Sequence, residues 1–324
     1  MKRSLRVALT LVVTTAAVAY ILVKIDLGKT AHILGSASVP WLLASFILCV
    51  IGVPPLAWRW QRLLAVRGVT ESLAWLTRAY LVSYAWGQIL PTSVGGDASR
   101  IFETARRHPG QITPITGSVL VERALGGAVT LLLAGVGFLL AIGRYPIGAY
   151  LWPEAIFVAL TIAAGVVFFS RSVRRRLGFL LPIVRRLHVE TPARAVYDGI
   201  HGYRAHPKTL LSVSGVTVLL QLTRIISIYA SGRAVGIHLS LLPYIVLGPL
   251  LFLVLLVPFT VNGLGVREAF FVSFLGNLHV NADSAFACGF LFFLMTIALA
   301  LPGVAVILWE QVFDRRATEA SPSA

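Results

Sequence analysis

The chain has 324 residues, of which 57% are hydrophobic and 13% are charged, and its mean hydropathy is +0.83. Such a composition excludes an ordinary soluble domain, and the apolar runs are continuous rather than alternating, which excludes a β-barrel. We therefore predict an all-α polytopic membrane protein. The net charge of +15 falls in loops between apolar runs, where basic residues orient the protein in the membrane and attract anionic lipid headgroups, so it does not indicate nucleic-acid binding.

Six apolar runs are predicted to cross the bilayer completely, within one transmembrane domain over 1–313 that is followed by a disordered cytoplasmic tail at 314–324. The first run could also be a signal peptide, because Ala17-Val18-Ala19 resembles a cleavage site. The apolar stretch continues to Val23, which favours an uncleaved helix, and both readings stay open. The predicted crossings are 5–23, 39–57, 115–142, 154–170, 209–231 and 284–309.

Two further apolar stretches are predicted to enter the membrane and return as re-entrant hairpins, over 73–97 and 241–278. In the second, only Ala269–Leu278 is clearly helical after the glycines, and ten residues span about 15 Å, half of the bilayer core. With both hairpins, the predicted cytoplasmic segments carry 20 Lys and Arg and the external ones carry 4. This bias agrees with the positive-inside rule and puts both termini in the cytoplasm. A topology with eight full crossings remains the alternative.

Each hairpin contains one copy of a polar signature. The first reads Leu90-Pro-Thr-Ser-Val-Gly-Gly-Asp-Ala-Ser-Arg100, and the second, 167 residues later, reads Val257-Pro-Phe-Thr-Val-Asn-Gly-Leu-Gly-Val-Arg-Glu268. Pro, Val, Gly and Arg keep the same offsets in both copies. Interrupted apolar segments at corresponding places in two halves point to an inverted repeat and to a binding site near the bilayer midplane.

Arginines also lie within the apolar segments, where a charge costs about 2.5–3.5 kcal/mol on insertion scales. Arg224 lies in the middle of its predicted crossing, Arg123 follows Glu122 near the start of another, and Arg78 can reach the cytoplasmic interface. A planar guanidinium binds phosphate oxygens bidentately and keeps its charge when desolvated. For Arg123, a structural ion pair is an equally good interpretation.

Together these features predict a site for a phosphate-bearing lipid headgroup. Glycines at the start of a half-helix expose backbone N–H groups, and the helix dipole there favours anions. Catalytic, metal-binding and cofactor motifs are absent from the sequence, so none of the residues is assigned a catalytic role. The candidate binding residues are Gly95, Gly96, Asp97, Arg100, Glu122, Arg123, Arg224, Asn262, Gly263, Gly265, Arg267 and Glu268.

The two signatures, with Val121-Glu122-Arg123 between them, resemble the lysylphosphatidylglycerol synthase transmembrane-region family. Its members are also called flippase-like domain proteins, and some are associated with hopanoid biosynthesis. The resemblance covers nearly the whole chain and implies a bacterial or archaeal inner-membrane protein that handles a lipid or a lipid-linked headgroup. The soluble aminoacyl-transfer domain of the namesake synthases has no counterpart here, so aminoacyl transfer is not expected.

Three functions remain open from the sequence. The first is a flippase-like protein that binds and translocates an anionic, phosphate-bearing or isoprenoid-linked lipid. The second is an integral-membrane enzyme, or the partner of a lipid- or glycan-modifying enzyme, with Asp97, Glu122 and Glu268 as candidate acids or bases. The third is a structural membrane scaffold. If Arg100 and Arg267 reach one cavity, they are expected to share one phosphate ligand; otherwise each pairs with a nearby carboxylate.

Overall fold

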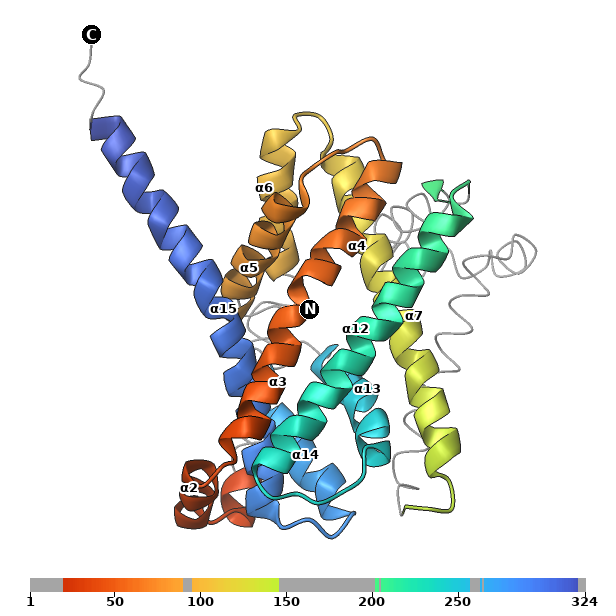
Figure 1. The fold of residues 1–324 in the computed structure, drawn as a ribbon, viewed down its shortest axis with the longest axis vertical. Helices are drawn as coiled ribbons and strands as arrows, with labels where there is room; N and C mark the ends of the chain where they lie inside the picture. Colours follow the sequence, from red (N-terminus) through yellow and green to blue (C-terminus); the bar gives the residue numbers. More distant parts are fainter. Residues whose placement is uncertain are drawn as a thin grey trace, which may run out of the picture.

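The computed structural model describes residues 20–89, 95–145, 202–203, 205–256, 263 and 265–319. Within these ranges the chain is helical without strands, which confirms the all-α polytopic membrane fold. The helices are α2 (Leu27–Gly35), α3 (Val39–Ile51), α4 (Val53–Val66), α5 (Leu73–Ile89), α6 (Gly95–Arg107), α7 (Ile112–Ala141), α12 (Pro207–Ala234), α13 (Leu242–Leu256), α14 (Val266–Gly276) and α15 (Ala282–Glu319) (Figure 1).

Within the described ranges, four segments are long and apolar enough to cross a bilayer, and each overlaps a predicted crossing. α3 and α4 together form a span of 28 residues, α7 one of 30, α12 one of 28, and Ala282–Glu310 of α15 one of 29. The other two predicted crossings, 5–23 and 154–170, lie outside the described residues, except that Tyr20–Val23 is helical.

The structure differs from two predicted boundaries. The crossing predicted at 39–57 continues to Val66, because Pro54 stands in the first turn of α4, where a missing N–H breaks no helical hydrogen bond. The tail predicted to be disordered from Asp314 is helical up to Glu319, because α15 propagates into it, while residues 320–324 lie outside the described part.

Two helix pairs enter the molecule from opposite ends. α5 and α6 lie side by side and antiparallel. α5 runs into the interior from the end of the molecule where α4 finishes, and α6 runs back to that same end, where α7 begins (Figure 1). α13 runs into the interior from the other end, where α12 finishes, and α14 runs back to that end, where α15 begins. In each pair the second helix therefore starts in the interior, at Gly95 and at Val266. Most residues between the paired helices, 90–94 and 257–262, lie outside the described part.

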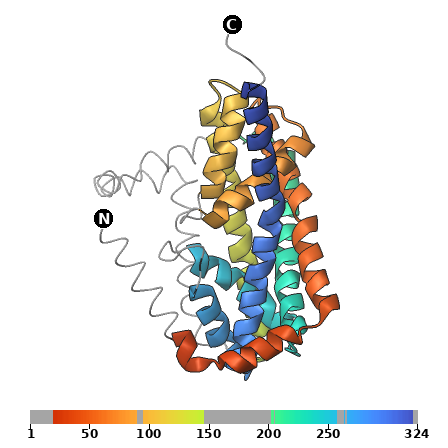
Figure 2. The ribbon, with the colours of Figure 1, turned by 90° about the vertical axis from the view of Figure 1, so that its left-hand side faces the viewer.

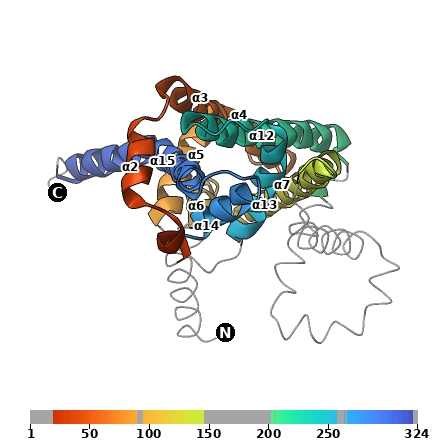
Figure 3. The ribbon, with the colours of Figure 1, turned by 90° about the horizontal axis from the view of Figure 1, so that it is seen from below.

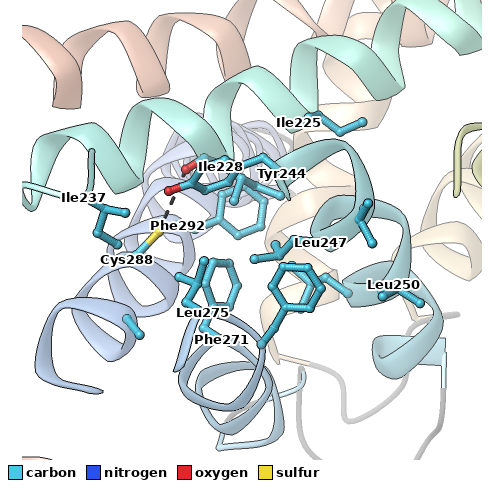
Figure 4. Close-up of a cluster of buried hydrophobic side chains, with 14 of the residues drawn as sticks. Ile225, Ile228, Ile237, Tyr244, Leu247, Leu250, Phe271, Leu275, Cys288 and Phe292 are labelled. Carbon is cyan, nitrogen blue, oxygen red and sulfur yellow. Dashed lines mark hydrogen bonds between the residues drawn. The ribbon is translucent and has the colours of Figure 1, made fainter. Parts of the chain in front are cut away.

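α15 runs along the length of the helix bundle, in contact with α5 of the first pair and α14 of the second (Figure 2). Seen from below, α14 lies between α13 and α15 (Figure 3). Their apolar side chains form the larger buried cluster with α12 (Figure 4). It includes Tyr244 and Leu247 of α13, Phe271 and Leu275 of α14, and Cys288 of α15. This packing fixes where α14 begins, and with it the second copy of the signature.

The contact between α3 and α12 is polar at its centre. The Ser45 hydroxyl lies 3.0 Å from that of Ser227 and 2.9 Å from that of Ser231, and the Cys49 sulfur lies 3.2 Å from the Ser227 hydroxyl. Small hydroxyl side chains let helix backbones approach closely and hydrogen bond inside a membrane. These residues hold α12, and therefore Arg224, against α3.

The contact between α5 and α15 is close enough to be tested at a glycine. A methyl group at Gly303 would lie 1.9 Å from the carbonyl oxygen of Leu81, whereas one at Gly135 of α7 would meet no atom within 4 Å. We expect Gly303→Ala to lower the free energy of unfolding by about 1–3 kcal/mol through overpacking. Gly135→Ala should leave it unchanged or raise it. Thermal unfolding in detergent measures both; equal melting temperatures for the two variants would contradict this packing.

The orientation in the membrane can be tested by cysteine labelling in a Cys49→Ala, Cys288→Ala background. Pro109 lies between α6 and α7, and Ser240 lies between α12 and α13 at the opposite end; both are exposed. If α5 and α6 return to the cytoplasmic side, we expect an impermeant thiol reagent added outside intact cells or spheroplasts to label Ser240→Cys and to spare Pro109→Cys. External labelling of Pro109→Cys would instead support a full crossing at Leu73–Ile89.

Candidate functional site

A buried network of charged side chains surrounds the start of α6. Its central residue is Glu122 of α7, which is 4% exposed. The carboxylate accepts hydrogen bonds from Arg59 of α4, from the hydroxyl of Tyr80 of α5, and from Nη1 of Arg100 of α6 at 2.8 Å. Four helices therefore meet at one carboxylate, and Arg59 extends the network to Thr217 of α12 at 3.1 Å.

Asp97 forms the second half of this network. Its Oδ1 accepts from Nε of Arg100 at 3.0 Å and lies 2.9 Å from Nη2, and its Oδ2 accepts from Arg123. The Arg100 guanidinium also lies 4.5 Å from the ring of Trp60 and 4.6 Å from that of Tyr80. Arg100 thus has two carboxylate partners, a hydroxyl and two aromatic faces, and it is 2% exposed.

The local sequence explains how α6 brings Asp97 and Arg100 to this place. The two residues are one helical turn apart, so their side chains share a face. Gly96 lets the start of α6 lie directly against α5, since a Cβ there would be 2.5 Å from the carbonyl oxygen of Ser83. Gly96 of the first copy therefore serves close helix packing.

The second copy of the signature builds a smaller cluster at the start of α14. Gly263 and Gly265 have φ of 73° and 82°, the left-handed region that glycine adopts without strain. Glu268 accepts from the backbone N–H of Gly265 at 2.7 Å and from Nε of Arg267 at 2.9 Å. Arg267 is 3% exposed and lies 4.4 Å from the ring of Phe293. Its Nη2 is buried and finds no hydrogen-bond partner among the described residues.

Arg224 of α12 lies near this second cluster. Its guanidinium is 5.9 Å from the ring of Phe252 of α13 and 6.0 Å from that of Phe292 of α15. Within the described residues it has no hydrogen bond and no ion pair, and electrostatic repulsion acts between it and Arg267. Arg224 is partly buried, so protein does not cover it completely.

The structure thus divides the predicted site residues into two groups. One contains Gly95, Gly96, Asp97, Arg100, Glu122 and Arg123; the other contains Arg224, Gly263, Gly265, Arg267 and Glu268, while Asn262 lies outside the described residues. Across the described part of the chain, Arg100 and Arg267 share no hydrogen bond, ion pair or aromatic ring. A phosphate site common to these two arginines stays a prediction.

Sequence reasoning missed Arg59, and with it Tyr80 and Thr217 of the same network. The predicted crossing ends at residue 57, so the sequence places Arg59 in the cytoplasmic loop that follows it. The available signal was its position between Trp58 and Trp60, since an arginine flanked by aromatic residues next to an apolar run is compatible with a helix that continues. For Arg123, the structure shows an ion pair with Asp97, whereas the adjacent Glu122 accepts hydrogen bonds from Arg59, Tyr80 and Arg100.

Two other polar features lie away from both clusters. At the end of the molecule where α4 finishes, Arg78 donates to Glu103 at 2.8 Å and to Glu310. At the opposite end, a cavity of about 280 Å³ lies between the end of α12, which contributes Arg233, and the connection from α2 to α3, which contributes Ser36 and Ser38. In the part of the chain that the structure describes, no three His, Cys, Asp or Glu residues are placed to hold a metal ion.

The comparison with known protein families agrees with the helical membrane architecture. The model of the family described as "Lysylphosphatidylglycerol synthase TM region" matches residues 7–303, which cover nearly the whole chain. No curated protein matches the chain. The family match agrees with the resemblance carried by the two signatures.

Proposed function

The chain belongs to the lysylphosphatidylglycerol synthase TM region family, and we propose that it binds an anionic, phosphate-bearing or isoprenoid-linked lipid by its headgroup and moves it between the two leaflets of the membrane. The family indicates a membrane protein that acts on lipids. We assign the protein to the inner membrane of a bacterium or archaeon, with both termini in the cytoplasm, on the basis of that family and of the positive-inside bias.

The observation that carries the proposal is the excess of arginine inside a bundle of membrane-spanning helices. Among the described residues of the two clusters, five arginines face three carboxylates: Arg59, Arg100, Arg123, Arg224 and Arg267 against Asp97, Glu122 and Glu268. A charge within a membrane span is costly and normally marks the path of a substrate or ion. Here the unbalanced charge is positive, so an anionic headgroup is the substrate part that it would attract.

The two helix pairs support translocation rather than binding alone. Each pair brings the N-terminus of a short helix, α6 or α14, into the interior from opposite ends of the molecule. Helix N-termini favour anions, and paired half-helices of opposite orientation are the architecture of many transporters. We propose that α5–α6 and α13–α14 are re-entrant hairpins, and that a headgroup passes between them while its acyl chains stay in the bilayer.

The contacts favour this function over an enzyme. General acid–base catalysis requires a carboxyl group that can reach substrate. Glu122 accepts three hydrogen bonds, Asp97 is held by two arginines, and Glu268 is held by Arg267 and a backbone N–H. None of the three is free to exchange protons with a ligand without first breaking an ion pair.

Reconstitution tests the proposal. The purified chain is placed in liposomes with trace fluorescent phosphatidylglycerol, polyprenyl phosphate or phosphatidylcholine, and an impermeant reductant then bleaches the outer leaflet. We expect bleaching beyond the outer-leaflet fraction for the anionic lipids and little for phosphatidylcholine. Bleaching no greater than in empty vesicles across this panel would contradict translocation. A chemically altered lipid, formed by the wild type and lost in Asp97→Asn, would favour the enzyme.

A further inference from the structure

The two copies of the signature use their arginines differently. Arg100 in the first copy is saturated: Asp97, Glu122 and Tyr80 accept its hydrogen bonds, and two aromatic rings cover its faces. Arg267 in the second copy has one carboxylate, and its buried Nη2 is without a partner in the described part of the chain. A buried N–H of a charged group that lacks an acceptor is costly, so its presence indicates a ligand that supplies the acceptor.

Arg224 lies close to the unsatisfied arginine. One of the two rings beside Arg224 is that of Phe292, and the ring beside Arg267 belongs to the next residue, Phe293, so both guanidiniums lie at the same level of α15. They repel each other, and no carboxylate among the described residues pairs with Arg224. Gly248 of α13 packs tightly against Ile225, which keeps α13 close to α12 directly beside Arg224. The repulsion is thus imposed by helix packing and would be relieved by an anion.

We infer that Arg224 and Arg267 together form an anion site that takes one singly charged phosphate group, whereas Arg100 is a structural residue. The local charge supports a monoanion, because two arginines and Glu268 leave a net charge of +1. A phosphodiester carries one negative charge, and the unpaired guanidinium edges are suited to its oxygens. The aromatic rings of Phe252, Phe292 and Phe293 lie against the two guanidiniums. The inference deepens the proposed function and rests on it for the ligand being a lipid.

Binding to the full-length protein in detergent micelles tests this assignment. The probes are phosphatidylglycerol, phosphatidylcholine with its zwitterionic headgroup, and inorganic phosphate as competitor. Arg224→Gln and Arg267→Gln are each expected to weaken phosphatidylglycerol binding about tenfold to a hundredfold, the effect of losing one charged hydrogen bond. Because both residues bind one ligand, the double variant should lose less than the product of the two factors. Lysine at either position should restore binding poorly, since it lacks the planar fork.

The matched control is Arg233→Gln. Arg233 lies at the C-terminal end of α12, the helix that carries Arg224, and its guanidinium is 5.5 Å from the ring of Trp41. This variant should bind phosphatidylglycerol as the wild type does. Binding is compared only among variants whose melting temperatures match that of the wild type. If a glutamine variant fails to fold, Arg224→Lys or Arg267→Lys replaces it in the comparison. Wild-type affinity in folded Arg224→Gln and Arg267→Gln proteins overturns the inference, even if lipid translocation by the wild type is intact.

The remaining outcomes separate the site from its ligand. If inorganic phosphate displaces the lipid at equal concentration and its binding depends on Arg224 and Arg267, the anion site stands and the lipid function fails. If lipid binding depends on Arg100 in folded Arg100→Lys protein and not on Arg224 or Arg267, the lipid function stands and the assignment is wrong. If neither phosphatidylglycerol nor phosphate binds the wild type, both are wrong.

Discussion

Replacing Glu122 by glutamine is expected to lower the free energy of unfolding by about 3–5 kcal/mol, the loss typical when one partner of a buried ion pair is removed. Arg59, Tyr80 and Arg100 all donate to this carboxylate. An amide of the same size accepts fewer hydrogen bonds and carries its own N–H donors, which would face two guanidiniums. Thermal or denaturant unfolding in detergent, together with protein abundance in the membrane, measures the effect.

Glu103 provides the matched control for this prediction. It also pairs with an arginine, Arg78 at 2.8 Å, but both side chains are about one quarter exposed. Glu103→Gln should therefore cost at most about 1 kcal/mol, as for an exposed ion pair. Adding Arg59→Met to Glu122→Gln should recover part of the lost stability, because it removes one of the uncompensated charges. Equal stability of the Glu122 and Glu103 variants would show that the network does not hold the four helices together.

Arg224→Gln should have the opposite pattern, with a large loss of activity and no loss of stability. Within the described residues the Arg224 guanidinium has no carboxylate partner, and it repels Arg267, so its removal should leave the melting temperature unchanged or higher. If Arg224 holds the headgroup, translocation of phosphatidylglycerol in liposomes should fall about tenfold to a hundredfold. Arg233→Gln is the control for the charge of the protein as a whole. Normal translocation by Arg224→Gln would remove this residue from the path.

The sequence was sufficient to predict the all-α polytopic fold class, because a bilayer constrains it strongly. Apolar length marked the four described crossings, and the uneven distribution of Lys and Arg suggested the hairpin arrangement over 73–97. The repeated Gly and Arg positions correctly marked two helix starts, at Gly95 and Val266. The boundary of α4 could not be predicted as easily, because Pro54 is a helix breaker in general and acceptable only in the first turn.

Residue pairing within the site was beyond the sequence. Glu122 and Arg123 are adjacent in the chain and point to different partners, because consecutive helical residues do not share a face. Arg59 joins Glu122 across two helices whose relative position depends on packing around Trp60 and Ser118, which are hydrogen bonded at 2.9 Å. The different environments of Arg100 and Arg267 likewise arise from neighbours on other helices. The same position in the two copies of the signature is therefore expected to have a structural role in one copy and a binding role in the other.

The most direct test of lipid passage through the interior is to locate the headgroup itself. Two phosphatidylglycerols are reconstituted with the protein, one with a photoactivatable diazirine in the headgroup and one with it at the end of an acyl chain, and the adducts are mapped by mass spectrometry. We predict headgroup adducts around Arg224, on Phe252, Phe292 or Phe293, which disappear in Arg224→Gln, while the acyl probe labels exposed apolar residues such as Leu132 and Leu219. Headgroup adducts confined to the helix ends would contradict the account.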